Sequence, residues 1–152
     1  MGAVAASRAI YDTITGAAGD APGIELFHGY TYSAHVLACA AAVATIDLYR
    51  DEHLFDRARS LEAQWEQAVH SLAGKPHVID IRNWGLVAGI ELAPRPGAPG
   101  ARATALFRDL FDTGLLVRAT GDIIALSPPL IISEAQIDEI VGRLAEGLDR
   151  LS

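Results

Sequence analysis

Apolar residues recur at helical spacing along much of the chain. The spacing of Ile10 and Ile14 predicts a short helix over residues 8–15, and a longer helical region covers about 35–72. The first half of this long region is rich in alanine, whereas the second half has the one-sided apolar pattern of an amphipathic helix. Because Asp51 lies at a break in the pattern, we expect it to cap a second helical segment.

Two more helices are expected toward the C-terminal end. A stripe of leucine and phenylalanine over residues 106–111 predicts a helix that ends at Gly114. Ser133 and Gln136 have the spacing of a capping box, in which the two residues cap a helix reciprocally. The helix that follows them carries one apolar face, made of Ile137, Ile140, Val141, Leu144, Leu148 and Leu151.

Strand-like segments precede and separate these helices. Residues 1–7 are small and apolar, like a buried strand. Residues 77–92 contain two β-like segments with a break at 83–85, and residues 115–127 contain two more around a tight turn at 120–122. The pattern therefore predicts an α/β part followed by a small α+β unit.

Length and composition indicate a folded chain. With 152 residues, of which 51% are hydrophobic and 20% charged, the chain can form one compact domain, or one domain plus a fragment of another. A formal net charge of -7 and a pI near 5.1 argue against the basic surface that nucleic acids and anionic membranes require. The longest apolar stretch, residues 36–46, is shorter than the roughly 20 residues that span a bilayer.

Several kinds of site are excluded by the remaining residues. Cys39 is the one cysteine, so no internal disulfide can form. We expect Cys39 to lie on a helix, with its small apolar side chain buried. His28 and His35 lack the further ligands of a zinc site, so no metal is expected. No G-x-S-x-G, G-x-G-x-x-G or Walker A motif occurs. An N-terminus without a charged region or a cleavage pattern indicates a cytoplasmic protein.

Anion binding remains as candidate chemistry. Thr31 and Ser33 stand just before a predicted helix, where a hydroxyl and the first-turn N–H groups can bind a phosphate; Ser33 also fits a plain N-cap. Arg118 lies at the end of a predicted strand, where its guanidinium could bind a carboxylate through two parallel hydrogen bonds. The alternative is a strand-edge arginine in solvent or paired with Asp122.

Five segments stand out in order along the chain: MGAVAAS, FHGYTYSAH with the alanine-rich helix after it, RNWGLVAGIEL, GLLVRATGDIIALSPPLIIS and the closing QIDEIV helix. Together they resemble the C-terminal part of class III pyridoxal-phosphate-dependent aminotransferases. Within that class they are most similar to the ω-amino acid:pyruvate, or β-alanine:pyruvate, branch. The resemblance covers essentially the whole chain.

The resemblance implies a fold-type I enzyme that binds pyridoxal phosphate and forms an obligate homodimer with active sites at the subunit interface. Residues 1–45 would be the tail of the large cofactor-binding domain, 46–74 a linking helix and 75–152 the small C-terminal α+β domain. The implied reaction moves an amino group from an ω-amino acid or amine to pyruvate. A mutase or decarboxylase of the same family stays an alternative, because the residues that distinguish those reactions lie mostly upstream.

Two residues match functional positions of the family. Thr31 matches the threonine that reaches the cofactor phosphate of the other subunit. Arg118 matches the arginine that swings to bind the substrate α-carboxylate and moves aside for apolar groups. Tyr30, Tyr32 and His28 belong to the same loop as Thr31, and we assign them to shape and packing.

The chain departs from the family in two respects. Residues 33–36 read Ser-Ala-His-Val where Ser-Gly-His-Pro is common, which removes a permissive glycine and a helix-starting proline. Transamination also needs a lysine that holds the cofactor as a Schiff base and moves the proton, and in the family this lysine lies upstream of the position of Met1. Lys75 is the sole lysine of the chain and does not match it.

We therefore expect the 152-residue chain alone to be catalytically inert, with weak or no binding of pyridoxal phosphate. A truncated reading frame or an excised part of a longer enzyme is the leading interpretation. One alternative is a non-catalytic remnant that dimerises through its alanine-rich helix and small domain. The other is one half of a split enzyme whose second chain supplies the lysine.

Overall fold

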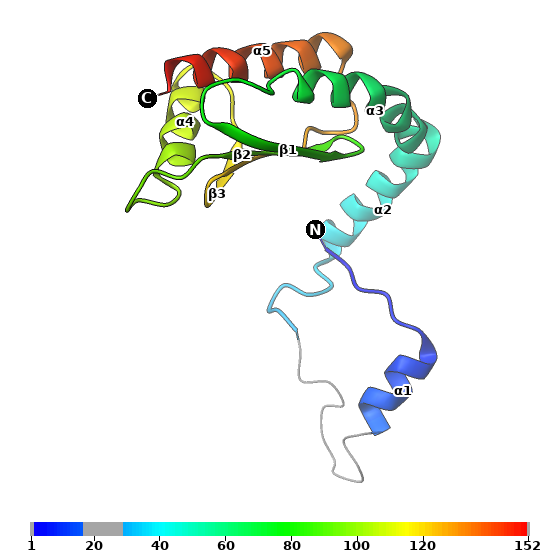
Figure 1. The fold of residues 1–152 in the computed structure, drawn as a ribbon. Coiled ribbons are helices and arrows are strands. Elements are labelled where there is room, and N and C mark those ends of the chain that lie inside the picture. The colour runs from blue at the N-terminus through cyan, green and yellow to red at the C-terminus, as the bar shows by residue number, and fades with distance from the viewer. Residues whose placement is uncertain (1, 17–28, 152) are drawn as a thin grey trace. The chain divides into compact units, whose positions relative to one another are not determined.

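Most of the predicted helices and strands form in the computed structural model, which describes residues 2–16 and 29–151 (Figure 1). The chain divides into two compact units, Met1–Asp51 and Glu52–Ser152. In chain order the elements are α1 (Arg8–Gly16), α2 (Val36–Asp51), α3 (Leu54–His70), β1 (Val78–Trp84), β2 (Val87–Leu92), α4 (Ala101–Asp112), β3 (Arg118–Thr120), β4 (Ile123–Leu126) and α5 (Glu134–Arg150).

The second unit is built on an antiparallel sheet of strand order β1-β2-β4-β3. β1 and β2 form one hairpin, and β3 and β4 form the other. Gly85 and Gly121 lie in the two turns with φ values of 52° and 57°, a left-handed conformation that glycine adopts at little steric cost. The two predicted strand pairs are confirmed, although residues 115–117 lie outside the regular part of β3.

One face of this sheet forms the core together with α3, α4 and α5. Successive side chains of a strand point to opposite faces, so alternate residues of β2 and β4 are buried. α3 and α5 pack against each other over the sheet, and α4 packs on α5 and β3 (Figure 1). The side chains with the least access to solvent are Trp65, Val69, Leu72, Ile90, Leu92, Leu106, Leu110, Ile124, Ile137, Leu144 and Leu148.

α5 begins at the predicted capping box, which is confirmed. The Gln136 backbone N–H donates to the Ser133 hydroxyl at 3.2 Å, and the Ser133 backbone N–H donates to the Gln136 side-chain oxygen at 2.9 Å. Farther along, α5 meets α4 at Gly147. A Cβ at this position would lie 2.9 Å from Leu106 Cδ1 and 3.0 Å from Leu110 Cδ2, so the glycine allows the two helices to approach closely.

The long helical region is interrupted where the sequence predicts. α2 ends at Asp51, and α3 begins at Leu54 after His53, whose φ of 50° is left-handed. The prediction that Asp51 caps the second segment is wrong, because His53 occupies the N-cap position and Asp51 instead accepts a hydrogen bond from Arg50 at 3.3 Å. The break also separates the two units, so residues 46–74 contribute to both.

The strand predicted for residues 1–7 is not formed in the described part of that segment. Residues 2–7 have no regular structure and are exposed. A strand satisfies its backbone N–H and C=O groups by pairing with a neighbour. The four described strands pair among themselves, so this apolar segment has no sheet of its own to join.

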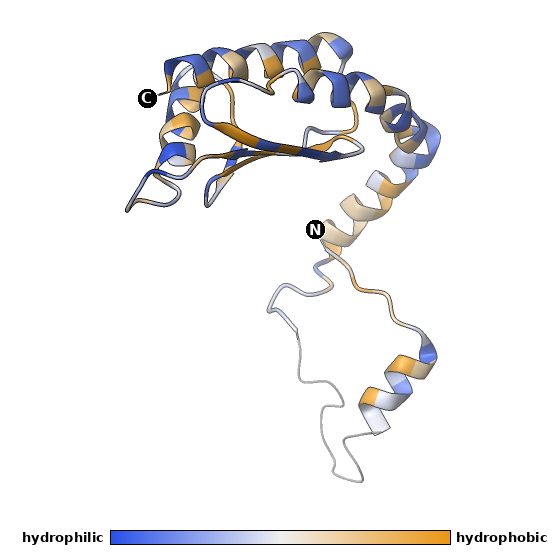
Figure 2. Cartoon of the chain, in the orientation of Figure 1, coloured by the Kyte–Doolittle hydropathy of each residue, from blue (hydrophilic) through white to orange (hydrophobic). Residues whose placement is uncertain are grey.

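The described part of the first unit contains two helices, α1 and α2, and neither helix buries a residue. α1 confirms the helix predicted over 8–15. α2 is apolar over most of its surface (Figure 2), and Val36 and Leu37 are 78% and 76% exposed. Cys39, which we expected to be buried, is half-buried. A helix that is apolar all round is normally covered by other protein. Among the described residues, no helix combines the length and the apolar character needed to cross a bilayer.

Two glycines of α5 should respond oppositely to substitution. Gly142 has open space at its Cβ position, so Gly142→Ala should raise the free energy of unfolding by about 0.5–1 kcal/mol through helix propensity. Gly147→Val should lower it by about 1–3 kcal/mol, because the new side chain would overlap Leu106 and Leu110. Chemical denaturation of the chain measures both changes. Equal effects of the two substitutions would contradict the packing of α4 on α5.

Candidate functional site

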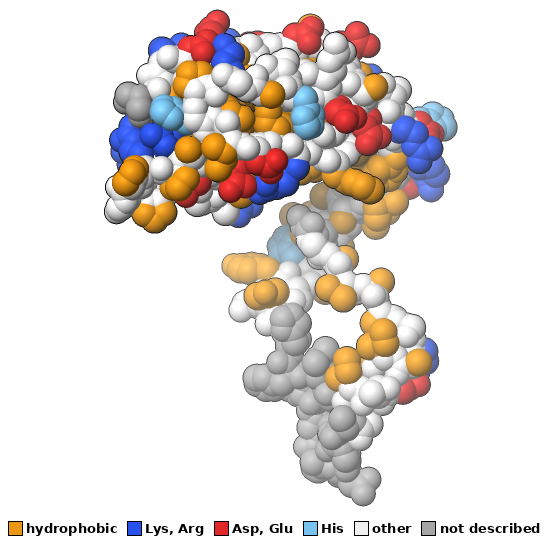
Figure 3. Space-filling view, in the orientation of Figure 1, with side chains coloured by type: hydrophobic (Ala, Val, Ile, Leu, Met, Phe, Trp, Pro, Cys, Tyr) orange, Lys and Arg blue, Asp and Glu red, His pale blue; other side chains and the backbone are white. Residues whose placement is uncertain are grey.

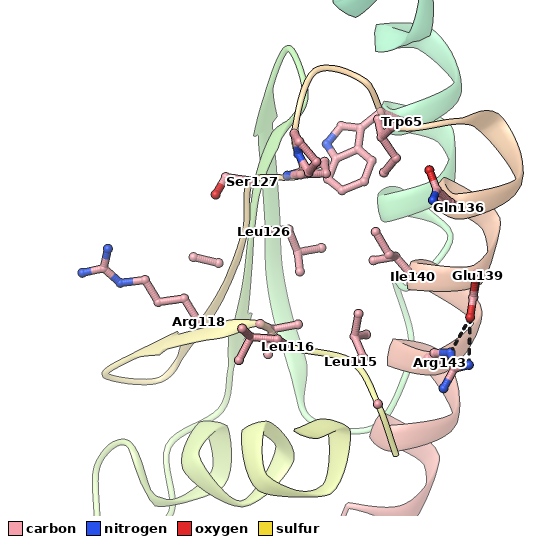
Figure 4. A pocket seen from close by; sticks show the side chains of 16 residues that line it. Trp65, Leu115, Leu116, Arg118, Leu126, Ser127, Gln136, Glu139, Ile140 and Arg143 are labelled. Atoms are coloured by element: carbon pink, nitrogen blue, oxygen red, sulfur yellow. Dashed lines mark hydrogen bonds and ion pairs between the residues drawn. The ribbon is translucent and has the colours of Figure 1, made fainter. Parts of the chain in front are cut away.

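Arg118 opens β3, an edge strand of the sheet. Its side chain is exposed and points away from Trp65 and Ile140 (Figure 4), toward the face of the sheet that the helices leave uncovered. Asp122, the alternative partner, instead accepts a hydrogen bond from the Gly100 backbone N–H at 2.8 Å. No described residue forms a hydrogen bond or an ion pair with the Arg118 guanidinium. The donors of Arg118 are therefore available to a ligand.

A cavity of about 590 Å³ lies on the helix side of β3 and β4 (Figure 4). Its wall is mainly apolar and includes Trp65, Leu115, Val117, Leu126, Ile132 and Ile140. Arg118, on the edge strand β3, and Ala125 also line it. Arg143 stands at the wall, but it pairs with Glu139 at 2.8 Å and also donates a hydrogen bond to the Thr113 carbonyl. Of the two arginines that line the cavity, Arg143 is therefore already paired, whereas Arg118 has no partner among the described residues.

The side of the sheet opposite α3 and α5 is its open face. Residues paired across neighbouring strands point to the same side. The register pairs Arg82 with Gly89, Gly89 with Ala125, and Ala125 with Arg118. Together with the neighbouring row and the Trp84–Val87 pair, the open face comprises Asp80, Arg82, Trp84, Val87, Gly89, Glu91, Arg118, Thr120, Ile123 and Ala125.

The open face also carries a charged cluster that sequence reasoning missed. Arg82 Nη1 lies 2.9 Å from Glu91 Oε2, and Arg82 is also hydrogen-bonded to Asp80. The hydrogen bonds to Glu91 and Asp80 raise the pKa of the Arg82 guanidinium. The alternation of charge along β1 is a signal of a solvent-facing side, but only the register with β2 adds Glu91 to it. Acidic and basic side chains are likewise interspersed over the side of this unit visible in Figure 3.

Thr31 begins the turn that leads into α2. The Ser33 N–H donates to the Tyr30 carbonyl at 2.9 Å, and the Tyr30 N–H donates to the Ser33 hydroxyl at 3.0 Å. Ser33 is therefore not the N-cap of α2; the Ala38 N–H donates to His35 Nδ1 at 3.4 Å instead. The exposed Thr31 hydroxyl forms no hydrogen bond with any described residue.

The geometry of this turn is compatible with an anion. The Thr31 hydroxyl precedes the first turn of α2, whose N–H groups lie at the positive end of the helix dipole. Ala34 has a φ of 58°, which a glycine would adopt freely and an alanine adopts at a cost of about 1–2 kcal/mol. The Tyr32 and His35 rings pack edge to face with centroids 6.1 Å apart. His28, assigned to the same loop, lies outside the described residues, as does most of the loop before it.

Thr31 and Arg118 belong to different units, and each offers donors that no described residue pairs. Lys75 differs from Thr31 and Arg118 because its side chain already has an ion-pair partner. Its Nζ lies 2.6 Å from Asp149 Oδ2, so that the segment after α3 is tied to the last turn of α5. The Lys75 ammonium is therefore already paired with a carboxylate.

Comparison with known proteins bears directly on these residues. The family model described as aminotransferase class III matches residues 1–148. The chain is 64% identical over 140 residues to an omega-aminotransferase of Caulobacter vibrioides, covering 92% of this chain and 31% of that protein. It is 38% identical over 152 residues to the beta-alanine–pyruvate aminotransferase of Pseudomonas aeruginosa, covering 100% and 34%. The chain thus spans about a third of the length of these relatives.

Solved structures agree with the sequence matches. A thermostable omega transaminase mutant from Pseudomonas jessenii superimposes with a TM-score of 0.74 at 32% identity, covering 82% of this chain and 29% of that one. An adenosylmethionine-8-amino-7-oxononanoate aminotransferase from Methanocaldococcus jannaschii superimposes with a TM-score of 0.71 at 28% identity, covering 84% and 30%. From its sequence and its fold alike, the chain belongs to the class III aminotransferase family.

Proposed function

We propose that these residues are the C-terminal part of a pyridoxal-phosphate-dependent aminotransferase that moves an amino group from an ω-amino acid or amine to pyruvate. The names of the relatives support this substrate class, since they include beta-alanine–pyruvate and omega-amino acid–pyruvate aminotransferases. The observation that carries the proposal is an arginine without a partner among the described residues, Arg118, on the open face of the sheet in a chain of this family.

Arg118 binds the carboxylate of the substrate in this proposal. A planar guanidinium matches a carboxylate through two parallel, charge-assisted hydrogen bonds. Its position on an edge strand leaves the side chain room to move, and no described residue has to release it first. Arg118 therefore orients the acceptor, and it can withdraw when an apolar amine occupies the same space.

Thr31 and the N-terminus of α2 bind the cofactor phosphate. Pyridoxal phosphate, when bound, supplies the electron sink for breaking a bond at the amine carbon. The Thr31 hydroxyl and the first-turn N–H groups of α2 are donors of the kind that a phosphate dianion accepts. In a homodimer the phosphate would be that of the partner subunit, and the exposed apolar surface of α2 would be covered by protein.

The proton-moving lysine of the reaction is not among these residues. Lys75 is held by Asp149 and lies on neither the open face nor the turn before α2. We propose that residues 1–45 complete a large cofactor-binding domain, that 46–74 link it to the small domain of residues 75–152, and that the chain by itself is inactive.

The native polypeptide should therefore have a mass well above the 16.1 kDa of these residues. Intact-mass measurement on protein purified from its own cells tests this expectation. A mass of 16.1 kDa would contradict it and favour a non-catalytic remnant or a split enzyme. Co-purification of a second chain that carries pyridoxal phosphate would then support the split enzyme, and a soluble oligomer indifferent to the cofactor would support the remnant.

Arg118→Met in the full-length enzyme should reduce kcat/KM for pyruvate by about 10- to 100-fold, because charge-assisted hydrogen bonds to the carboxylate are lost. Steady-state kinetics with pyruvate, and a half-reaction with an amine that lacks a carboxylate, measure the effect. The amine half-reaction should change little. Arg143→Met, in the wall of the apolar cavity, is the matched control and should leave pyruvate kinetics near the parent value. The reverse pattern would assign the carboxylate to Arg143.

Thr31→Ala should weaken cofactor retention by about tenfold in the full-length dimer, because one hydrogen bond to a charged phosphate is lost. Thr31→Ser keeps the hydroxyl and should restore retention. Loss of cofactor absorbance during dialysis against phosphate buffer measures the difference. If both variants retain the cofactor like the parent, Thr31 does not contact the phosphate.

A further inference from the structure

The row of open-face residues that contains Arg118 ends in a second arginine. Arg82 and Arg118 occupy the two outer strands, and Gly89 and Ala125 lie between them on the two inner strands. Three strand spacings of about 4.8 Å place the two arginine Cα atoms roughly 14 Å apart. No side chain larger than a methyl group stands between them in this row, so the two arginines lie at the two ends of one row on the same face of the sheet.

Such an arrangement would suit a ligand with a carboxylate at each end, but Arg82 is not available to it. The Arg82 side chain lies over β2, because a Cβ at Gly89 would be 3.8 Å from Arg82 Cγ and 3.9 Å from its Nε. Its guanidinium is hydrogen-bonded to both Glu91 and Asp80. Two carboxylates and one guanidinium leave this cluster with a net charge of -1, so a second substrate carboxylate would meet repulsion there.

We propose that Asp80 and Glu91 determine substrate specificity: by holding Arg82, they leave Arg118 as the anion-binding arginine of this row and restrict the site to monocarboxylate acceptors of the pyruvate kind. The net negative charge of the Asp80, Arg82 and Glu91 cluster, at the end of the row opposite Arg118, disfavours binding of dicarboxylic oxo acids. Discrimination by a repulsive element is a usual route to specificity. This inference rests on the proposed role of Arg118 as the carboxylate-binding residue.

The test measures anion binding by the 152-residue chain directly, without catalysis. The 15N–1H signals of the Arg82 and Arg118 side-chain Nε groups are followed by NMR while acetate or glutarate is added at low ionic strength. In the parent chain, Arg118 should respond equally to both anions, and Arg82 should respond to neither. In the double variant Asp80→Asn, Glu91→Gln, Arg82 should respond as well, and glutarate should bind up to about fivefold more tightly than acetate.

A matched variant controls for the loss of any arginine–carboxylate pair. Asp109→Asn removes the partner that lies 2.7 Å from Arg150, between α4 and α5, and should leave the Arg82 and Arg118 responses like those of the parent. Backbone amide spectra of all variants report whether the fold is kept, and the single variants Asp80→Asn and Glu91→Gln serve if the double variant does not fold.

The outcomes separate this inference from the proposed function. The specificity role of Asp80 and Glu91 is overturned if the Arg82 signal shifts with acetate in the parent chain. It is also overturned if the Arg82 signal does not shift with either anion in the variants. An Arg118 that ignores both anions in the parent contradicts its proposed carboxylate binding. In that event, the Arg82 response in the variants still decides whether the two acids keep Arg82 from anions.

Discussion

Burial of one face of the sheet against α3 and α5 is the interaction on which the second unit depends. β2 and β4 are the inner strands, and their alternate side chains enter the core with Trp65 and Leu144. Because side chains alternate with a period of two, a slip of one residue would exchange buried Ile90 for Gly89 or Glu91. The core therefore locks the strand register. Everything on the open face follows from that register, including residues that make no contact with the core.

This separation of faces organises the chemistry of the unit. Beside β3 and β4 lies a mainly apolar cavity lined by two arginines, of which Arg143 is already paired. The open side carries Arg118 without a partner among the described residues, and it carries Arg82 with two. Two arginines on one face thus differ in their partners, because Arg82 has Asp80 on its own strand and Glu91 on the neighbouring strand. Their intrinsic chemistry is the same, and in our proposal the surrounding carboxylates decide which of them can bind an anion.

The first unit exposes apolar surface that other protein would normally cover. α2 exposes apolar side chains over most of its surface, and residues 2–7 are apolar without a strand to pair with. Both features suit a chain that covers about a third of its relatives' length and would pack against the remainder in the proposed full-length enzyme. In the proposed function the two units supply donors for a phosphate and a carboxylate, whereas Lys75 is paired with Asp149. In the proposed enzyme, the groups that bind cofactor and substrate lie among these residues, whereas the proton-moving lysine lies in another part of the protein.

The sequence alone determined the helices, the two strand pairs, the capping box at Ser133 and the placement of Arg118 on a strand, because each depends on side chains close together in the chain. The N-cap residues of two helices were not predicted correctly from the sequence. His35 rather than Ser33 caps α2, and His53, in a left-handed conformation, occupies the N-cap position of α3 instead of Asp51. Only the tertiary structure shows that Glu91 lies beside Arg82 and that Arg82 and Arg118 share one row of the sheet. The reason is physical: pairing across strands is set by which faces are buried together, and that register cannot be read from the spacing within any one strand.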